Sequence, residues 1–297
     1  MRHALLVAIV LTSSWSLAQD CTTYVVLTAY DRLTGVPIET LKTEDFEARM
    51  GNAALPVVTS SQHFNNRLLV LLETDGAAND DKIEDEVNVV TRMARQAPEG
   101  ISVAFGVFAE KAVFTKEFFA DSQKRDAGIS EVIEQKNSLG KRVALWDALH
   151  QAVALFGQHQ PGDTVLLVSD VYDDKSSHSG SDVEKELIAR GIRLYAMRRR
   201  HASHVDRDFL LNSHELEKTV LERTIKETGG VYSEFSVFLF RFAWAGYMLG
   251  IKVPGGLEKP RKWKLQFRGP AAEVHHKSNL YYPEQLPPCS RVTAAAH

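Results

Sequence analysis

Leu68-Leu69-Val70-Leu71-Leu72 is an uninterrupted aliphatic run that is followed directly by Glu73. A run of this kind is typical of a strand that is buried on both faces of a parallel sheet. The segments 101–108, 164–169 and 192–197 have the same apolar character. Together these four segments predict the central strands of a parallel sheet.

Amphipathic segments lie between and after the predicted strands. They are 83–94, 129–135, 145–156, 183–189 and 216–227. Gly229 and Gly230 directly follow the last of them, where glycine commonly ends a helix. The alternation of strands and helices predicts an α/β fold with a doubly wound, mostly parallel sheet.

Segments of β character flank this α/β unit on both sides. Strands are predicted at 23–30, at 44–49, from Val57, at 263–267 and at 280–282, whereas 235–247 fits either a helix or a strand. β-Branched and aromatic residues between turn residues are the basis for these strands. We expect residues 19–64 and 233–289 to pack together as one small β-sandwich beside a domain of residues 65–232.

The first residues have the three parts of a secretory signal peptide. A short basic start at 2–3 precedes the apolar segment 4–11, and Ser16-Leu17-Ala18 supplies small residues for cleavage before Gln19. This pattern predicts a signal peptide at 1–18 and a mature protein that is periplasmic or secreted. The alternative is a buried N-terminal strand. At the other end, 290–297 is expected to be a disordered tail.

The two cysteines, Cys21 and Cys289, lie near the two ends of the predicted mature chain. In an oxidising compartment an isolated pair of cysteines is a candidate disulfide bond. Such a bond requires the two Cα atoms to lie about 5.5 Å apart, so the first and last segments would share one domain. The alternative is two free thiols.

Charge and motifs argue against several classes of function. The net charge of -3 and a pI near 6.4 give no reason to expect a nucleic-acid partner. No run of about 18 apolar residues lies in the body of the chain, so we expect no membrane span in the mature protein. Neither G-x-S-x-G nor H-E-x-x-H occurs, and we therefore predict a protein that is not an enzyme.

Three loops are predicted at the carboxyl ends of the central strands, at 73–77, 140–148 and 170–174. In an open parallel sheet, ligands bind outside the carboxyl ends of the strands. The polar residues of these loops are therefore the candidates for a binding site.

The order of these features resembles a von Willebrand factor A domain. It consists of an apolar run, an acidic loop, G-x-x-x-A-L-W-D-A-L from Gly140, and V-L-L-V-S-D ending at Asp170. The segment 31–47, D-R-L-T-G-V-P-I-E-T-L-K-T-E-D-F-E, is similar to the N-terminal segment of bacterial proteins related to this family. T-G-G-V-Y from Thr228 and the tyrosines at 281–282 extend the resemblance over nearly the whole predicted mature chain.

The resemblance implies a metal-ion-dependent adhesion site. Its five ligand positions fall on Glu73, Asp75, Ala77, Val143 and Asp170, of which only Asp170 keeps the family residue. Ala77 and Val143 have no side-chain oxygen, whereas Mg²⁺ demands near-ideal octahedral oxygen geometry. We therefore predict a degenerate site with no metal and no other cofactor. The alternative is a remodelled Mg²⁺ or Ca²⁺ site formed by Glu73, Asp75 and Asp170.

The same resemblance implies a protein-binding module that acts in adhesion or as a scaffold. We predict that it binds another protein directly through Glu73, Asp75, Arg142, Asp170 and Tyr172. One hypothesis is that Arg142 forms a salt bridge with one of these carboxylates and so replaces the charge of the lost metal. The alternative function is cation-dependent adhesion through the remodelled site.

The run Arg198-Arg199-Arg200-His201, with His204 nearby, follows the fourth predicted strand. We interpret it as a charged strand end and loop, because charge runs are usually solvated. Binding of an acidic partner is the alternative.

Overall fold

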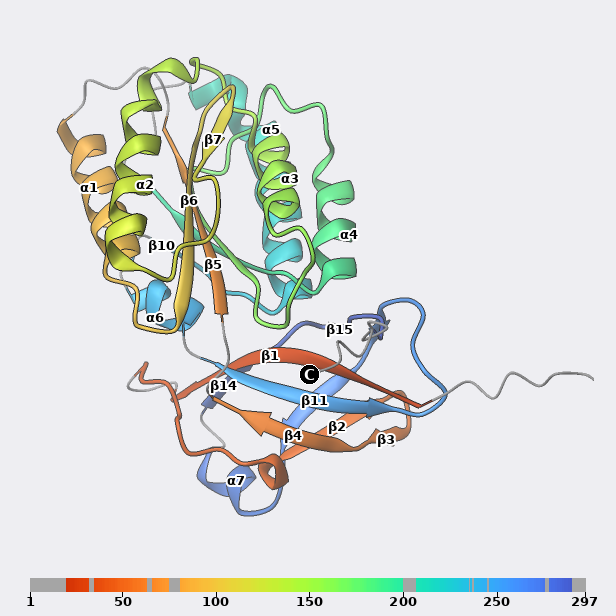
Figure 1. Cartoon of the computed structure of the whole chain (residues 1–297). Coiled ribbons are helices and arrows are strands. Elements are labelled where there is room, and N and C mark those ends of the chain that lie inside the picture. Colours follow the sequence, from red (N-terminus) through yellow and green to blue (C-terminus); the bar gives the residue numbers. More distant parts are fainter. Residues whose placement is uncertain are drawn as a thin grey trace, which may run out of the picture.

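The computed structural model describes residues 20–31, 35–62, 66–74, 81–199, 207–234, 236, 238–244, 246–275 and 278–289. The predicted signal peptide and the predicted tail 290–297 lie outside these ranges, as do Asp75 and Ala77. The described chain has two parts, an α/β part and a β-sandwich (Figure 1).

A six-stranded sheet forms the centre of the α/β part, in the order β10-β9-β8-β5-β6-β7. Its strands are β5 (Asn66–Glu73), β6 (Ile101–Phe108), β7 (Ala112–Phe114), β8 (Thr164–Ser169), β9 (Arg193–Arg198) and β10 (Tyr232–Glu234). Neighbouring strands are parallel, except for β6 and β7, which are antiparallel. The predicted doubly wound, mostly parallel sheet is confirmed.

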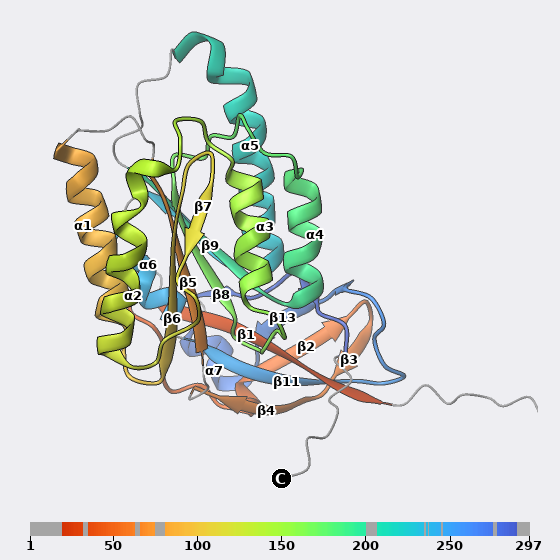
Figure 2. The ribbon, with the colours of Figure 1, turned by 45° about the horizontal axis from the view of Figure 1, so that its top comes forward.

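Helices cover both faces of this sheet (Figures 1 and 2). The first face holds α1 (Asp81–Arg95), α2 (Ser122–Glu134) and α6 (Phe238–Trp244), and the second holds α3 (Leu145–Leu155), α4 (Gly180–Arg190) and α5 (Arg207–Thr228). Leu68, Val70 and Leu72 of β5 pack on the first face, and Leu69 and Leu71 pack on the second. Side chains alternate along a strand, so the aliphatic run is buried on both sides. None of the described helices is long and apolar enough to cross a membrane.

The segment 235–247, whose sequence fits either a helix or a strand, contains a helix and the start of a strand. Helix α6 is followed by strand β11 (Tyr247–Val253). Leu239, Phe240 and Ala243 of α6 pack into the core of the α/β part. That part therefore continues beyond residue 232, where the sequence placed its end, because α6 buries its apolar face against the sheet.

Two antiparallel sheets form the β-sandwich, one in the order β14-β1-β11-β4 and the other in the order β13-β2-β3. Besides β11, the strands of these sheets are β1 (Cys21–Asp31), β2 (Phe46–Met50), β3 (Ala53–Leu55), β4 (Val57–Ser61), β13 (Lys264–Phe267) and β14 (Ser278–Tyr281). Leu27, Phe46, Leu249 and Trp263 meet in the core between the sheets. The segments on either side of the α/β part therefore pack together, as predicted.

Short elements complete both parts. They are η1 (Thr43–Asp45), η2 (Lys136–Ser138), α7 (Gly269–Val274), β12 (Arg261–Lys262) and β15 (Gln285–Leu286). β12 and β15 pair with each other as a two-stranded sheet.

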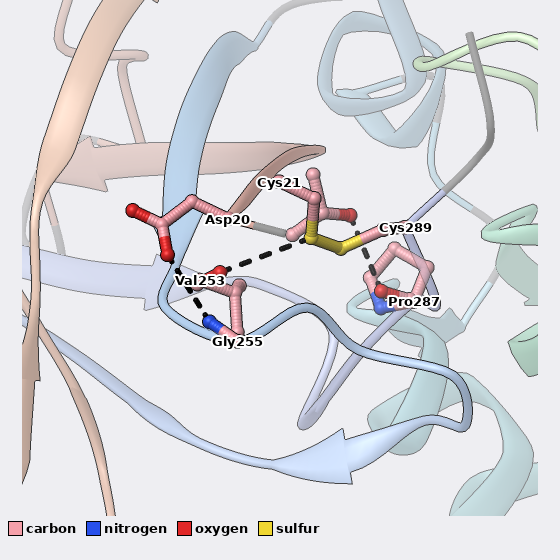
Figure 3. The surroundings of a disulfide bond; sticks show 7 residues. Asp20, Cys21, Val253, Gly255, Pro287 and Cys289 are labelled. Carbon is pink, nitrogen blue, oxygen red and sulfur yellow. Dashed lines mark hydrogen bonds between the residues drawn. A yellow bond between two sulfur atoms is a disulfide. The ribbon is translucent and has the colours of Figure 1, made fainter. Parts of the chain in front are cut away.

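A disulfide bond joins Cys21 to Cys289 and ties the first strand to the end of the described chain (Figure 3). The two Cα atoms are 6.2 Å apart, within the usual range for disulfides. Beside the bond, the amide of Cys289 donates a hydrogen bond to the carbonyl oxygen of Leu257 at 2.8 Å. The predicted pairing is confirmed.

The β-sandwich packs against the amino ends of the parallel strands. Arg193, the first residue of β9, donates a hydrogen bond to the Thr28 hydroxyl of β1 at 3.3 Å. The same hydroxyl lies 3.1 Å from the Tyr195 hydroxyl. The carboxyl ends of the strands therefore lie at the far end of the molecule, away from the β-sandwich (Figures 1 and 2).

Candidate functional site

Three neighbouring strands end in charged side chains at the carboxyl edge of the sheet. β5 ends at Glu73, Asp170 directly follows β8, and Arg199 directly follows β9. β8 pairs with β5 on one side and with β9 on the other. Because carboxyl ends of parallel strands share one edge, the three side chains gather there, and all three are buried.

Glu73 has an exposed fraction of 0%. Its Oε2 accepts hydrogen bonds from the Ser169 hydroxyl at 2.5 Å and from the Asp170 amide at 3.1 Å. Burial raises the pKa of Glu73 well above its usual range, and the charge of Asp170 raises it further, whereas Arg199 opposes the rise. Burial and the neighbouring charge thus disfavour the ionised form of Glu73.

Arg199 is the cation of this cluster. Its side chain is 1% exposed, and its Nη1 lies 3.8 Å from Glu73 Oε1. Its Nε lies 3.5 Å from Oε2 of Glu86, a buried residue of α1. The amide of Arg199 donates to the carbonyl oxygen of Ser169 at 3.1 Å, which fixes the backbone beside β8. A guanidinium group thus lies between carboxylates from a strand and from a helix.

The chain turns sharply after Asp170. Val171 has a φ of 67° and is the one non-glycine residue with a positive φ among those that the structure describes. A β-branched residue rarely adopts this conformation, which costs about 1–3 kcal/mol. The Val171 side chain is nevertheless buried in the core, and its amide donates to the Ser169 hydroxyl at 2.8 Å. The turn buries Asp170 and Val171 and leaves Tyr172 half-buried at the surface.

The loop that follows β8 is fastened to the start of α3. Asp173 Oδ1 accepts hydrogen bonds from the Leu145 amide at 2.7 Å and from the Ser176 hydroxyl at 2.5 Å. The Ser176 oxygen accepts from the amides of Trp146 at 2.9 Å and Asp147 at 3.1 Å. Amides of a first helical turn have no partner within the helix, so the loop supplies the cap that α3 needs.

Asp174 and Arg142 join two loops at the surface. Asp174 Oδ1 accepts from the Val143 amide at 2.8 Å, and Arg142 Nε donates to Asp174 Oδ2 at 3.1 Å. The Arg142 side chain is 51% exposed. Burial raises the pKa of the nearby Tyr172, and the charge of Asp174 raises it further. We call the set of exposed Arg142 and half-buried Tyr172 and Asp174 the rim.

Asp147 of α3 holds the far part of the same loop. Its carboxylate accepts hydrogen bonds from the amides of Ser177 at 3.0 Å and His178 at 2.9 Å, and lies 2.7 Å from His178 Nδ1. Burial by itself would raise the pKa of Asp147, but these hydrogen bonds outweigh it and lower the pKa to about 2. Carboxylates of the loop itself, Asp173 and Asp174, and the Asp147 carboxylate of α3 therefore hold the loop in place.

Replacement of Asp147 with asparagine is expected to lower the free energy of unfolding at neutral pH by about 1 kcal/mol. The carboxylate is 23% exposed, so solvent screening reduces what its lowered pKa contributes. Because the folded-state pKa lies below the ordinary 3.8, this stabilisation is present above pH 3.8 and is lost as the pH falls towards 2. Urea denaturation at neutral and acid pH measures both effects. The exposed control Asp126→Asn is expected to change neither the stability at neutral pH nor its dependence on pH. Equal stabilities of wild type and Asp147→Asn would contradict the prediction.

The structure separates the predicted site residues into two groups. Glu73 and Asp170 are brought together, and both are buried. Arg142 and Tyr172 lie at the surface. Arg142 pairs with Asp174 and not with Glu73 or Asp170, because the carboxylate of the neighbouring loop lies directly beside it.

The positive charge beside the buried carboxyl groups comes from Arg199. The sequence interpretation placed this residue in a solvated, charged strand end and loop. Alternation along β9 contained a signal for its burial. Tyr195, Met197 and Arg199 are spaced two apart, and the first two pack on the face of the sheet that α1 covers. The third position of that series points to the same face, where Glu86 lies on α1.

The described residues do not fit the divalent cation that the resemblance implies. Val143 offers no side-chain oxygen, and Glu73 Oε2 already accepts two hydrogen bonds. A guanidinium lies 3.8 Å from the other Glu73 oxygen. No group of three or more His, Cys, Asp or Glu in the described part of the chain is placed to hold a metal ion. Mg²⁺ and Ca²⁺ sites depend on the number and type of oxygen ligands, and this set falls short.

Several solved structures resemble this chain at low sequence identity. Similar solved structures include a von Willebrand factor type A protein from Catenulispora acidiphila, with 11% identity over 84% of this chain and 71% of that chain and a TM-score of 0.46. BatB from Bacteroides thetaiotaomicron has 14% identity over 58% of this chain and 90% of that chain, with a TM-score of 0.43.

Proximal thread matrix protein 1 from the mussel byssus, with a zinc-occupied MIDAS motif, is 14% identical over 64% of this chain and 48% of that chain, with a TM-score of 0.48. No protein-family model matches the chain, and no curated protein matches it. Likeness at such identities concerns the fold, and the zinc ion is a property of the mussel protein.

Proposed function

We propose that this chain is an exported, non-enzymatic module that binds another protein through the rim, without a metal ion. One fold serves many functions, so the proposal is based on the site and not on the fold. Its partner is a protein surface that accepts the Tyr172 ring and the Arg142 guanidinium.

The strained and fastened loop after β8 is the observation that carries the proposal. A buried valine with a φ of 67° persists only where its surroundings hold it, and such residues cluster at functional sites. Asp173, Asp174 and Asp147 hold this loop against the start of α3. A surface that is ordered before binding loses less conformational entropy when a partner docks.

The rim also has the side chains that protein recognition favours. Tyrosine and arginine are enriched among the residues that dominate binding energies. Arg142 is held by Asp174 through its Nε and through an Nη2 hydrogen bond to the Asp174 carbonyl oxygen. Its fixed position lowers the entropy that its side chain loses when it contacts a partner.

Two observations support export. The sequence begins with the pattern of a secretory signal peptide. The Cys21–Cys289 disulfide is of a kind that forms and persists in oxidising compartments.

Photo-crosslinking in the cells that make the protein tests the rim directly. A photoreactive amino acid at Tyr172 is expected to give a discrete crosslinked protein, and one at Tyr24, exposed on the β-sandwich, is expected to give none. Adding Arg142→Ala is expected to reduce the crosslinked yield about tenfold, as for an arginine that contributes a major share of affinity. The matched control is Arg49→Ala, an exposed arginine of β2.

Equal crosslinking from Tyr172 and Tyr24 would contradict the proposed rim. The same experiment with a chelator addresses the cation-dependent alternative. The proposal expects an unchanged yield in EDTA. A yield that disappears in EDTA and returns with Mg²⁺ would favour adhesion through a remodelled metal site.

A further inference from the structure

Residues 259–268 of the β-sandwich carry five cations and no carboxylate. We call these residues the basic segment. They hold five of the 35 Lys and Arg and none of the 38 Asp and Glu, so the rest of the chain has a formal charge of -8. A patch of one sign on a molecule of the other sign orients that molecule near a charged surface. The cations are Lys259, Arg261, Lys262, Lys264 and Arg268, and all five are exposed.

The alternation along β13 and the residue before it keeps the cations at the surface. Trp263 and Leu265 are each 5% exposed and pack in the core of the β-sandwich. Lys264, Gln266 and Arg268 are exposed, because successive side chains of a strand point to opposite faces. Lys264 and Arg268 are thus about 13 Å apart along one extended strand. The basic segment therefore presents separate cations on an open sheet face, while its apolar side chains point inward.

The neighbouring strand β2 does not neutralise this face. Lys264 lies directly opposite Arg49 in the sheet, and like charges in opposite positions destabilise a strand pair. Glu47 is a carboxylate of the same strand. It already accepts hydrogen bonds from Arg49 Nε at 2.6 Å and from Gln266 Nε2 at 2.9 Å. Arg49 is therefore compensated by Glu47, whereas Lys264 is not.

The basic segment itself has few ionic contacts. Lys262 is the one of its cations with an ion pair among the described residues, and its Nζ lies 3.7 Å from Glu227 Oε1. Arg268 Nε donates a hydrogen bond to the carbonyl oxygen of Glu44 at 2.7 Å, which fixes the side chain but does not neutralise its charge. Exposed charge that costs sheet stability without a compensating contact in the chain is best explained by a partner of opposite charge.

We propose that the basic segment attaches this chain to the surface of a bilayer that contains anionic phospholipids. The chain lies on this surface without crossing it. The inference goes beyond protein binding by the rim and does not depend on it, because it uses a different face. The β-sandwich packs against the amino ends of the parallel strands, whereas the rim lies at their carboxyl ends (Figures 1 and 2). Attachment through the basic segment therefore leaves the rim accessible.

The arrangement of the cations favours a bilayer over a protein or a free anion. Protein interfaces are depleted of lysine, and three of the five cations are lysines. A single phosphate ion cannot contact cations that lie about 13 Å apart, whereas lipid headgroups form a continuous plane. Each Lys or Arg near an anionic membrane contributes separately to binding, so an open face without an apolar anchor is sufficient.

Sedimentation of the purified chain with phospholipid vesicles tests the inference. Wild type is expected to bind vesicles of phosphatidylglycerol and phosphatidylcholine in equal parts, and not vesicles of phosphatidylcholine alone. The binding is expected to weaken as the salt concentration rises. Arg261→Gln/Lys264→Gln is expected to bind the mixed vesicles about thirtyfold more weakly, the loss expected for two cations at such a surface.

Lys116→Gln/Lys185→Gln is the matched control. These two lysines of the α/β part are 84% and 73% exposed, and their replacement changes the net charge of the chain by the same amount. Binding of this control to the mixed vesicles is expected to change by less than about twofold, because its charges lie beyond the range of screened attraction. Both variants are expected to keep the Tm of wild type, since all four side chains are exposed.

Four results would overturn the inference. The first is equal binding of wild type to the two kinds of vesicle, and the second is an equal loss of affinity in the two double variants. The third is binding of soluble dextran sulfate without binding of the mixed vesicles, which would assign the basic segment to an anionic polysaccharide. The fourth is a discrete protein crosslinked in cells from a photoreactive amino acid at Gln266. None of these results bears on the rim, which crosslinking from Tyr172 tests separately.

Discussion

Replacing Gly230 with alanine is expected to lower the free energy of unfolding by about 4 kcal/mol or more, a loss of the size seen when buried structure must move. A Cβ atom at Gly230 would lie 1.8 Å from the carbonyl oxygen and 2.6 Å from the carbonyl carbon of Leu194. Those atoms belong to the backbone of β9, which pairs with β8 in the centre of the sheet. Neither atom can move aside without disturbing that pairing. Urea denaturation measures the loss.

Gly157→Ala is the matched control for this prediction. Gly157 also follows a helix and has a φ of +56°, but nothing lies within 4 Å of a Cβ built there. Its replacement is expected to cost about 1 kcal/mol, the strain of a left-handed alanine. If Gly230→Ala is no more destabilising than Gly157→Ala, the close approach of residue 230 to β9 is wrong.

The double variant Cys21→Ser/Cys289→Ser is expected to lose roughly 5 kcal/mol of stability. The disulfide closes a loop with a sequence separation of 268 residues, and long closed loops restrict the unfolded chain most. The bond also joins the first strand of the β-sandwich to the segment after β15. A fall in Tm of several degrees is therefore expected.

Reducing agent separates the effect of the disulfide from that of the serine side chains. Wild type is expected to lose stability in reducing agent, while the double variant is expected to be insensitive to it. An unchanged Tm of reduced wild type would show that the β-sandwich does not depend on this bond.

The central strands could be predicted from the sequence because their burial leaves a local pattern. A strand covered on both faces has apolar residues at every position, as Leu68 to Leu72 do, and all of these side chains are buried. The strands of the β-sandwich were harder to predict from the sequence. β11 pairs with β1 and β4 at its centre, yet Gly250 interrupts its apolar pattern, and the segment before it fits two kinds of element.

The meeting of Glu73 and Asp170 could also be predicted, because parallel neighbouring strands end at one edge. Their burial could not be, since it depends on what packs over that edge. The partner of Arg142 could not be predicted either. Its sequence position allowed a bond to several carboxylates, and only the fold of the loop after β8 places Asp174 beside it.

Periodicity and composition by themselves predicted the α/β sheet, the packing of the two flanking β segments against each other and the candidate disulfide. Each of these features depends on the chemistry of short segments or of one residue pair. Tertiary structure alone decided which charge lies beside Glu73. That choice depends on the side of β9 that α1 covers and on the distance between residues that are far apart in the chain, and no local pattern contains such a distance.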